Sequence, residues 1–200
     1  MGRHSKSEER RGQILKAAAS LFVEHGYPNT SVRDIAAKCD MRVSNLYHYI
    51  GSKHNILGMF QEYTTYHLKN FMTENQSIIN SMDPVEAMRY ALKQYIEWVN
   101  EYQDVAIFWY QESKHLSPEQ LAKLAEQELY CVDVFQEVLA RGVAAGVFHI
   151  SDLRLAAHNI VVLCDMWAFR RWLIRKEYTF DQFVRQQTEL ILDRIHYTKT

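Results

Sequence analysis

Residues 31–53 read SVRDIAAKCDMRVSNLYHYIGSK and contain two short apolar patterns of helical period, separated by a break. Two helices locked at a fixed angle need a small residue where the second packs against the first, and Ala36 is in that place. Four positions on, the turn needs left-handed backbone, which Asp40 tolerates better than most non-glycine residues. Apolar residues fall at the spacings that a miniature core requires: Ile35, Cys39, Met41, Leu46 and Tyr49 or Ile50. The pattern predicts a helix-turn-helix; two ordinary short helices in a larger bundle are the alternative.

The rest of the chain is also predicted to be helical. It has only three prolines and seven glycines, and no Asn-Gly or Asp-Gly hairpin signal. Helix starts are marked at Asp83-Pro84, Ser117-Pro118 and Thr179-Phe180, with Ser52 and Ser151 as further caps. Gly142 and Gly146 bracket a stop. We therefore expect an all-α fold of about nine helices, in two domains: three short helices in residues 1–52 and six longer ones in residues 53–200.

The charge of the 200 residues is unevenly distributed. Residues 1–55 contain nine Lys and Arg against five Asp and Glu, a net charge of +4, whereas the remainder has 14 against 19, a net charge of −5. A basic head on an acidic body is the asymmetry expected when one end meets a polyanion, although a charged segment is often only a solvated face. The three widely spaced cysteines suggest free thiols in a reducing cytoplasm. No apolar run is long enough to span a membrane.

Enzymatic motifs are absent from the sequence. It contains no glycine-rich phosphate loop, no paired-carboxylate or nucleophile motif, and no close group of His, Cys and Glu. The nine histidines are scattered, which argues against a metal site. We expect no catalytic residues, no metal and no cofactor.

Residues 11–57, RGQILKAAASLFVEHGYPNTSVRDIAAKCDMRVSNLYHYIGSKHNIL, resemble the N-terminal domain of the tetracycline-repressor (TetR) family. The matching segments are ILKAAASLFVEHGY, TSVRDIAAKC and LYHYIGSK. The resemblance implies a cytoplasmic homodimer that binds a palindromic DNA operator, represses transcription, and releases DNA when a small-molecule effector enters the body. No membrane partner is expected, because the sequence has no apolar run of the length that a membrane span needs.

The same resemblance assigns roles to residues around the third helix. Arg42, Ser44 and Asn45 are at the end that enters the groove and are expected to reach base edges. Phosphate contacts are expected from Thr30, Ser31, Arg33, Tyr47, His48 and Lys53. The head departs from the family pattern at four positions, Asp40, Ser44, Ile50 and His54, which leaves the operator sequence open.

The body is rich in aromatic residues, which at helical spacing are more often core than ligand contacts. Resemblance to the family places an effector pocket among the fourth, fifth, seventh and eighth helices, with these candidates: Tyr63, His67, Met88, Tyr95, Phe108, Trp109, Phe135 and Asp165. The segments FWYQESKHLSPEQ and WAFRRWLIRKEYTF look like the subgroup that senses fatty acyl-CoA or other acyl-CoA thioesters. In that subgroup a basic cluster would meet the CoA phosphates, here Arg170, Arg171, Arg175 and Lys176; a solvated helix end is the alternative.

The last two helices are expected to form the dimer interface. Their apolar stripes would pack against a second copy as a four-helix bundle, with these contact residues: Trp167, Phe183, Gln187, Leu190 and Ile191. A second hypothesis is a TetR-like DNA-binding protein that answers to a protein partner, or acts architecturally, without a small ligand. Activation instead of repression is also open, because the sequence does not report where the operator sits.

Overall fold

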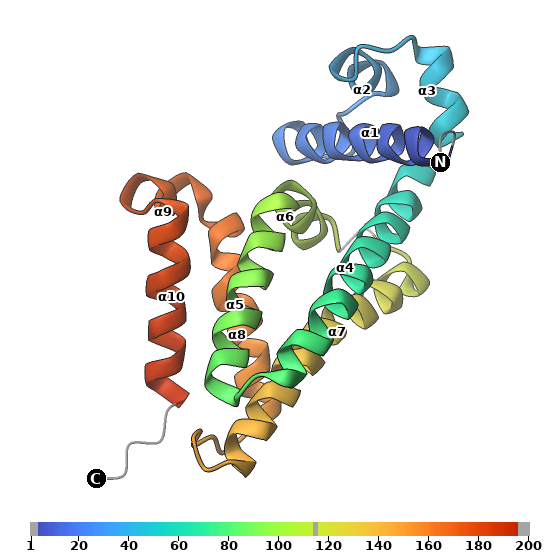
Figure 1. Cartoon of the computed structure of the whole chain (residues 1–200). Coiled ribbons are helices and arrows are strands. Elements are labelled where there is room, and N and C mark those ends of the chain that lie inside the picture. Colours follow the sequence, from blue (N-terminus) through green and yellow to red (C-terminus); the bar gives the residue numbers. More distant parts are fainter. Residues whose placement is uncertain (1–3, 114–115, 196–200) are drawn as a thin grey trace. The chain divides into compact units, whose positions relative to one another are not determined.

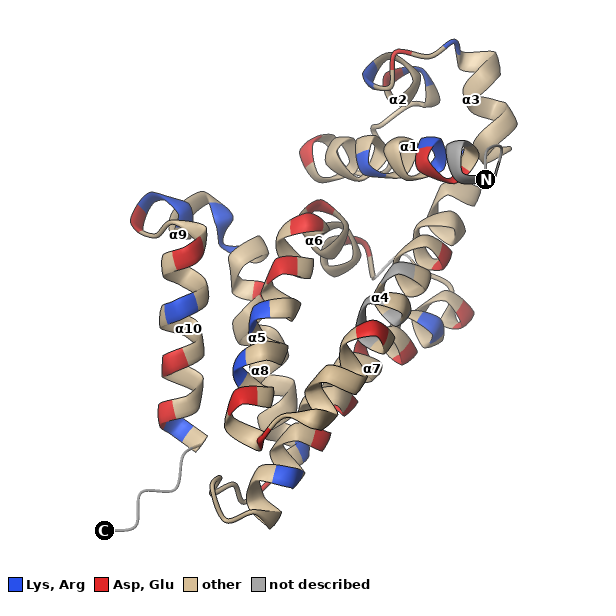
Figure 2. Ribbon diagram, viewed as in Figure 1, with Lys and Arg blue, Asp and Glu red and all other residues tan. Residues whose placement is uncertain are grey.

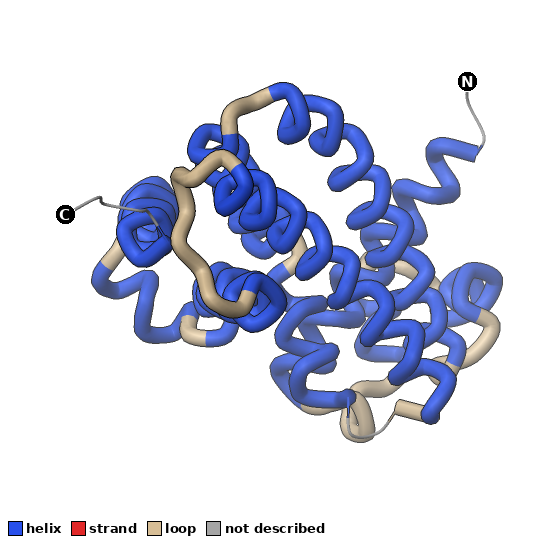
Figure 3. The backbone as a smooth tube through the Cα atoms, turned by 90° about the horizontal axis from the view of Figure 1, so that it is seen from below, coloured by secondary structure: helices blue, strands red, loops and turns tan. Residues whose placement is uncertain are grey.

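The structure, a computed structural model, describes residues 4–113 and 116–195. Ten α-helices are present in these residues, without a β-sheet (Figures 1 and 3). They are α1 (His4–His25), α2 (Val32–Lys38), α3 (Val43–Ile50), α4 (Asn55–Ser81), α5 (Pro84–Glu101), α6 (Gln103–Glu112), α7 (Pro118–Ala144), α8 (Leu153–Phe169), α9 (Arg171–Glu177) and α10 (Phe180–Ile195). The all-α prediction is confirmed. The count is ten in place of about nine, because Tyr102 and Arg170 leave helical backbone geometry and start new helices.

The helices group into two compact units. Unit 1 comprises residues 1–68 and 104–124, and unit 2 comprises residues 69–103 and 125–200. The predicted division into residues 1–52 and 53–200 is a division by function and stays a prediction. Among the described residues, no helix is both long enough and apolar enough to cross a membrane.

Unit 1 is built around the apolar face of α1. Ile14, Leu15 and Phe22 on this face are buried, and α2 packs against α1 while α3 packs against α2. The ring of Phe22 lies 6.1 Å from that of Phe60 on α4 and 5.2 Å from that of Phe108 on α6. The three-helix head therefore shares one aromatic core with the start of α4 and with α6.

Helix starts follow the predicted caps in most places. Asp83 accepts hydrogen bonds from the backbone of Val85 and Glu86, and Ser117 and Thr179 each form a reciprocal capping box. The predicted start at Ser151 is wrong by one residue, because the Asp152 carboxylate caps α8 by accepting from the Leu155 amide.

Gly142 and Gly146 bracket the end of a helix, as predicted. Helix α7 runs through Gly142 to Ala144, and the chain turns at Gly146, which has φ +71°. A Cβ atom on Gly142 would stand 1.8 Å from the Phe148 ring, so the glycine is needed for the close approach of the returning chain.

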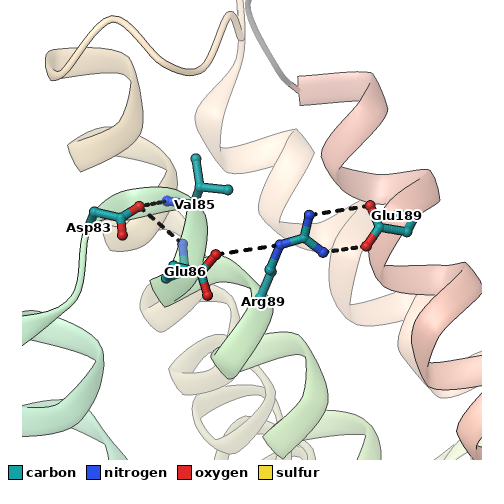
Figure 4. A network of polar contacts seen from close by, with 5 residues as sticks. All are labelled: Asp83, Val85, Glu86, Arg89 and Glu189. Atoms are coloured by element: carbon teal, nitrogen blue, oxygen red, sulfur yellow. Dashed lines mark hydrogen bonds and ion pairs between the residues drawn. The ribbon is translucent and has the colours of Figure 1, made fainter.

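Unit 2 is a bundle in which α5 packs against α8 and α10, and α8 also contacts α9. Its core side chains come from several helices, including Met88, Phe135, Ile160 and Leu192. On its surface the Arg89 guanidinium of α5 binds Glu189 of α10 through two hydrogen bonds and lies near Glu86, beside the Asp83 cap (Figure 4). This network joins the start of α5 to α10.

Candidate functional site

The turn between α2 and α3 has the geometry that the sequence predicts. Asp40 has φ +50°, in the left-handed region, and the Met41 amide donates to the Ala36 carbonyl at 2.9 Å. Ala36 is buried, as are Leu46 and Ile50 on the inner face of α3. The turn and the small helix-helix contact fix the angle between α2 and α3.

The outer face of α3 is polar and exposed. Arg42, Ser44, Asn45, Tyr47 and His48 are all exposed, with Tyr47 at 46%. Helix α3 contains no Lys, Arg, Asp or Glu, as Figure 2 shows, and Arg42 caps its start without a side-chain capping bond. The predicted base-reading residues therefore lie on one accessible face, which consists of neutral polar groups next to one guanidinium.

The start of α2 adds a second exposed group. Ser31 caps the helix and forms a capping box with Asp34, in which the Asp34 carboxylate accepts from the Ser31 amide at 2.7 Å. The hydrogen bonds from Ser31, with smaller help from the charges of His25 and Lys53, lower the pKa of Asp34. Ser31 and Arg33 are exposed here, in keeping with phosphate contacts.

Thr30 is placed differently from the prediction. Its side chain is buried, and its hydroxyl donates to the backbone carbonyls of Leu21 and Gly26, at 3.2 and 3.0 Å. The hydroxyl thus ties the turn after α1 to that helix. We correct Thr30 from a phosphate contact to a structural residue.

Lys53 is held beside the turn that precedes α2. Its Nζ donates to the Pro28 carbonyl at 3.2 Å and lies 4.4 Å from the centre of the Tyr27 ring. Partial burial lowers the pKa of Lys53, and the nearby Asp34 carboxylate opposes that shift. Tyr27 was not predicted as a functional residue, because its position directly after Gly26 gave no sign of this contact.

Two further contacts brace α2 against α1. The Arg10 guanidinium donates to the Cys39 carbonyl at 2.9 Å, and Lys38 Nζ binds Ser20 Oγ at 2.8 Å. The positive charge of Arg10 thereby lies at the C-terminal end of α2, where it interacts favourably with the negative end of the helix dipole. Some of the basic side chains of the head, here Arg10 and Lys38, therefore make contacts within the head itself.

The predicted effector-pocket residues divide between the two units. In unit 1, Phe108 is fully buried against Phe22 and Phe60, and Trp109 is buried beside it, so both belong to the aromatic core. Tyr63 is also in unit 1; its hydroxyl lies close to the backbone of Gly12, where a Cβ would be 2.6 Å away. The side chain of His67 lies outside the described residues.

The other four candidates are in unit 2, and all are buried. The Tyr95 hydroxyl of α5 donates to Asp165 Oδ1 of α8 at 3.2 Å, and the Phe135 ring of α7 meets the Tyr95 ring edge-on at 5.6 Å. Met88 is buried in the same bundle. Burial raises the pKa of Asp165 to about 7; repulsion from Glu128 adds to the rise, and the Tyr95 hydrogen bond opposes it. Burial also raises the pKa of Tyr95 and of the Cys131 and Cys164 thiols.

The predicted dimer residues are mostly internal to the chain. Trp167 is buried against Phe180 and Phe183, and its indole N–H donates to Asn100 Oδ1 at 2.8 Å. Phe183, Gln187 and Ile191 are also buried within unit 2, whereas Leu190 is 54% exposed. Phe183, Gln187 and Ile191 line grooves on the surface of unit 2, and Leu190 is the one of the five with a largely exposed side chain, so the interface assignment stays a prediction.

Two shallow grooves flank Leu190 on unit 2. One has a volume of about 320 Å³ between α8 and α10, with Asn159, Leu163 and Arg194 in its lining. The other has a volume of about 480 Å³ along α8, α9 and α10, with Arg170 and Gln187 in its lining. On α8, Leu155 and Val162 are exposed.

A short helix braced over a second helix that exposes a neutral polar face defines a helix-turn-helix DNA-binding regulator. The chain belongs to the tetR family: the family model "Bacterial regulatory proteins, tetR family" matches residues 14–58, and "Tetracyclin repressor-like, C-terminal domain" matches residues 81–173. Like its relatives, it is a transcriptional regulator and not an enzyme.

Relatives and solved structures support this assignment. The HTH-type transcriptional regulator HbdR of Aromatoleum sp. (strain CIB) is 26% identical over 93% of this chain and 80% of its own length. The HTH-type transcriptional repressor KstR2 of Rhodococcus jostii (strain RHA1) is 27% identical over 92% of this chain and 90% of its own. AibR in complex with isovaleryl coenzyme A and operator DNA shares the fold, with a TM-score of 0.72, 24% identity, and coverage of 90% of this chain and 97% of that one.

Proposed function

We propose that this protein is a repressor that binds a palindromic operator as a homodimer and releases it when a small apolar effector, such as a fatty acyl-CoA, enters the body. The observation that carries the proposal is the exposed polar face of α3, held by the buried Ala36 contact and the left-handed Asp40 turn. Residues 1–52 would bind DNA, and residues 53–200 would bind the effector and the second copy. The cytoplasm is the proposed location.

Arg42, Ser44 and Asn45 would reach base edges, because they occupy the first turn of α3 and are exposed. Arg42 would favour guanine and Asn45 adenine, the pairings that bidentate geometry permits in the major groove. Tyr47, His48, Ser31, Arg33 and Lys53 would contact phosphates and set the register of the head on the duplex.

The homodimer would form through the outer faces of α8 and α10. Leu155, Val162 and Leu190 give these faces exposed apolar side chains, and the 320 Å³ groove lies between the two helices. A twofold axis there would pair two heads, whose reading helices would then lie about 34 Å apart, one turn of DNA.

The acyl-CoA proposal is supported by the segments quoted above and by AibR, which binds isovaleryl coenzyme A and operator DNA. In unit 2, the buried group around Tyr95 and Asp165 offers polar atoms within an apolar bundle, the usual make-up of a small-molecule site. The alternative, control by a protein partner or an architectural role, needs no such ligand.

The test is an operator selection from random DNA duplexes, repeated with a panel of acyl-CoA thioesters and the matching free acids. We expect an enriched palindrome that one thioester class releases. A palindrome that no acyl compound releases would overturn the effector proposal and keep the regulator. Failure to enrich any sequence would favour the architectural role.

A further inference from the structure

A group of polar side chains is buried in unit 2 where α5, α7 and α8 meet. At its centre the Tyr95 hydroxyl donates to Asp165 at 3.2 Å. The groups that act on Asp165 are the buried Tyr95 from α5, Cys131 from α7 and Cys164 next to it on α8, together with Glu128 of α7, whose residue is exposed. None of these groups is a cation.

The Asp165 carboxyl has acceptor capacity to spare. A carboxylate can accept about four hydrogen bonds, and Tyr95 is its one side-chain donor among the described residues. Asp165 keeps 8% of its surface accessible, so the residue is close to fully enclosed. A buried carboxyl with one neutral donor is costly unless a further donor reaches it.

An unused donor lies on Trp98, the residue whose ring stacks on that of Tyr95. The Trp98 ring stacks on the Tyr95 ring, with centroids 6.1 Å apart and planes 16° from parallel. Its indole Nε1 is buried, and no hydrogen-bond partner for it exists in the part of the chain that the structure describes. Tyr95 thus donates to an acceptor with spare capacity and stacks on a ring whose donor has no partner among the described residues.

We propose that the effector of this regulator carries a hydroxyl group that binds at this cluster and donates a hydrogen bond to Asp165. The inference rests on the proposed effector function and specifies which effectors fit. A hydroxyl both donates and accepts, so it can also serve the Trp98 indole. An ammonium group lacks the acceptor, and a carboxylate would be repelled by Asp165 and Glu128. Asp165 is therefore the residue that distinguishes a hydroxylated acyl group from its plain counterpart.

The experiment uses matched pairs of thioesters that differ by one hydroxyl: isovaleryl-CoA with 3-hydroxyisovaleryl-CoA, and octanoyl-CoA with 3-hydroxyoctanoyl-CoA. Dissociation constants for the full-length protein are measured by calorimetry at pH 6 and pH 8. We expect the hydroxylated member of at least one pair to bind about tenfold more tightly at pH 8, the effect of one hydrogen bond to a charged group. The preference should be smaller at pH 6, where the protonated carboxyl is a weaker acceptor.

Three variants locate the effect. Asp165→Leu should remove the preference, and Asp165→Asn should remove its pH dependence. Tyr95→Phe, which takes away the internal donor but leaves the carboxyl, should keep the preference. Circular dichroism confirms that each variant is folded, and the Asn variant carries the test if the Leu variant does not fold.

The outcomes separate this inference from the proposed function. Equal binding within every pair would overturn hydroxyl recognition and leave the acyl-CoA regulator standing. A preference that persists with its pH dependence in Asp165→Asn would show that another residue reads the hydroxyl. No binding by any thioester would overturn the acyl-CoA function, and hydroxyl recognition with it.

Discussion

Asp40 is in the left-handed backbone region, the one non-glycine residue with positive φ among those described. This conformation costs most L-residues roughly 1 kcal/mol. The cost is smaller for Asp and Asn, whose short polar side chains tolerate it, and smallest for Gly. The strain lies in the turn that sets the angle of α3. At this position the identity of a single side chain therefore bears on both stability and the placement of the reading helix.

Replacement of Asp40 should follow the left-handed preference of the new residue. We expect Asp40→Gly to raise the free energy of unfolding by up to about 1 kcal/mol and Asp40→Val to lower it by about 1–2 kcal/mol. Urea unfolding measures both. Asp40→Asn is the matched control and should leave stability nearly unchanged. Equal stability of the Gly and Val variants would contradict the assigned conformation.

Asp165 makes stability depend on pH. Its pKa is about 7 in the folded chain, against 3.8 as an ordinary value. Between these pH values the native state holds a proton that the unfolded state has lost, so the free energy of unfolding falls as pH rises from about 4 to about 7. The loss is at most about 4 kcal/mol from the size of the shift.

Asp165→Asn tests this pH dependence. Asn resembles the protonated carboxyl, so wild type and variant should have similar stability near pH 4, and the variant should be the more stable near pH 8. Thermal unfolding at several pH values gives the comparison. Parallel curves for the two proteins would mean that Asp165 titrates in the folded state as an ordinary aspartate.

At the scale of single elements, α3 separates two tasks along its length. Leu46 and Ile50 on one side hold it to the head, and the exposed residues on the other side are available for DNA. This division predicts two kinds of mutational effect within one helix.

Asn45→Ala should relax the preference at one base pair at a cost of about 1–3 kcal/mol on the best operator. Tyr47→Ala and Lys53→Ala should weaken binding to all sequences and reduce its salt dependence. Binding to an operator and to scrambled duplexes at several salt concentrations distinguishes the two effects. Unchanged operator affinity in all three variants would exclude α3 as the reading helix.

The cap of α5 is a second element-scale feature. The Asp83 carboxylate satisfies two backbone amides at the start of this helix (Figure 4). Asp83→Ala should cost about 1 kcal/mol in the free energy of unfolding, and Asp83→Asn, which keeps the acceptor, should cost much less. Chemical denaturation measures both. A similar loss in the two variants would assign the effect to charge and not to capping.

Prediction from sequence succeeded where the cause is local. The turn at Asp40 and the caps at Asp83, Ser117 and Thr179 are set by a few neighbouring residues, and each was predicted. The burial of Thr30 depends on two carbonyls of the preceding helix end, which no local pattern reports. The helical spacing of apolar residues likewise predicted that Trp167 and Phe183 make apolar contacts. Such spacing does not distinguish packing within the chain from packing against a second copy.

At the scale of the whole molecule, the proposed homodimer would form through the surface of unit 2. Leu155, Val162 and Leu190 are exposed on α8 and α10, and isolated apolar residues of this kind are common on monomers. Leu190 in addition lines an apolar groove between α8 and α10, and this groove favours a second copy on that face.

Leu190→Glu should convert the dimer to a monomer, because it puts a charge into the proposed apolar contact. Sedimentation velocity measures the mass, and operator binding should weaken at the same time, since one head has about half of the contacts. Leu121→Glu, at an exposed leucine of unit 1, is the control and should leave the mass unchanged. A dimer that withstands Leu190→Glu would place the interface elsewhere.

The separation of tasks on α3 also bears on how such a protein changes its target. Ser44, Asn45, Tyr47 and His48 have no side-chain hydrogen bonds within the described part of the chain, whereas Ala36, Asp40 and Leu46 hold the fold. The outer four positions can therefore be exchanged at little cost to stability. Under the proposed role of α3, substitutions at these four positions would direct the regulator to a different operator sequence and leave the residues that position the helix unchanged.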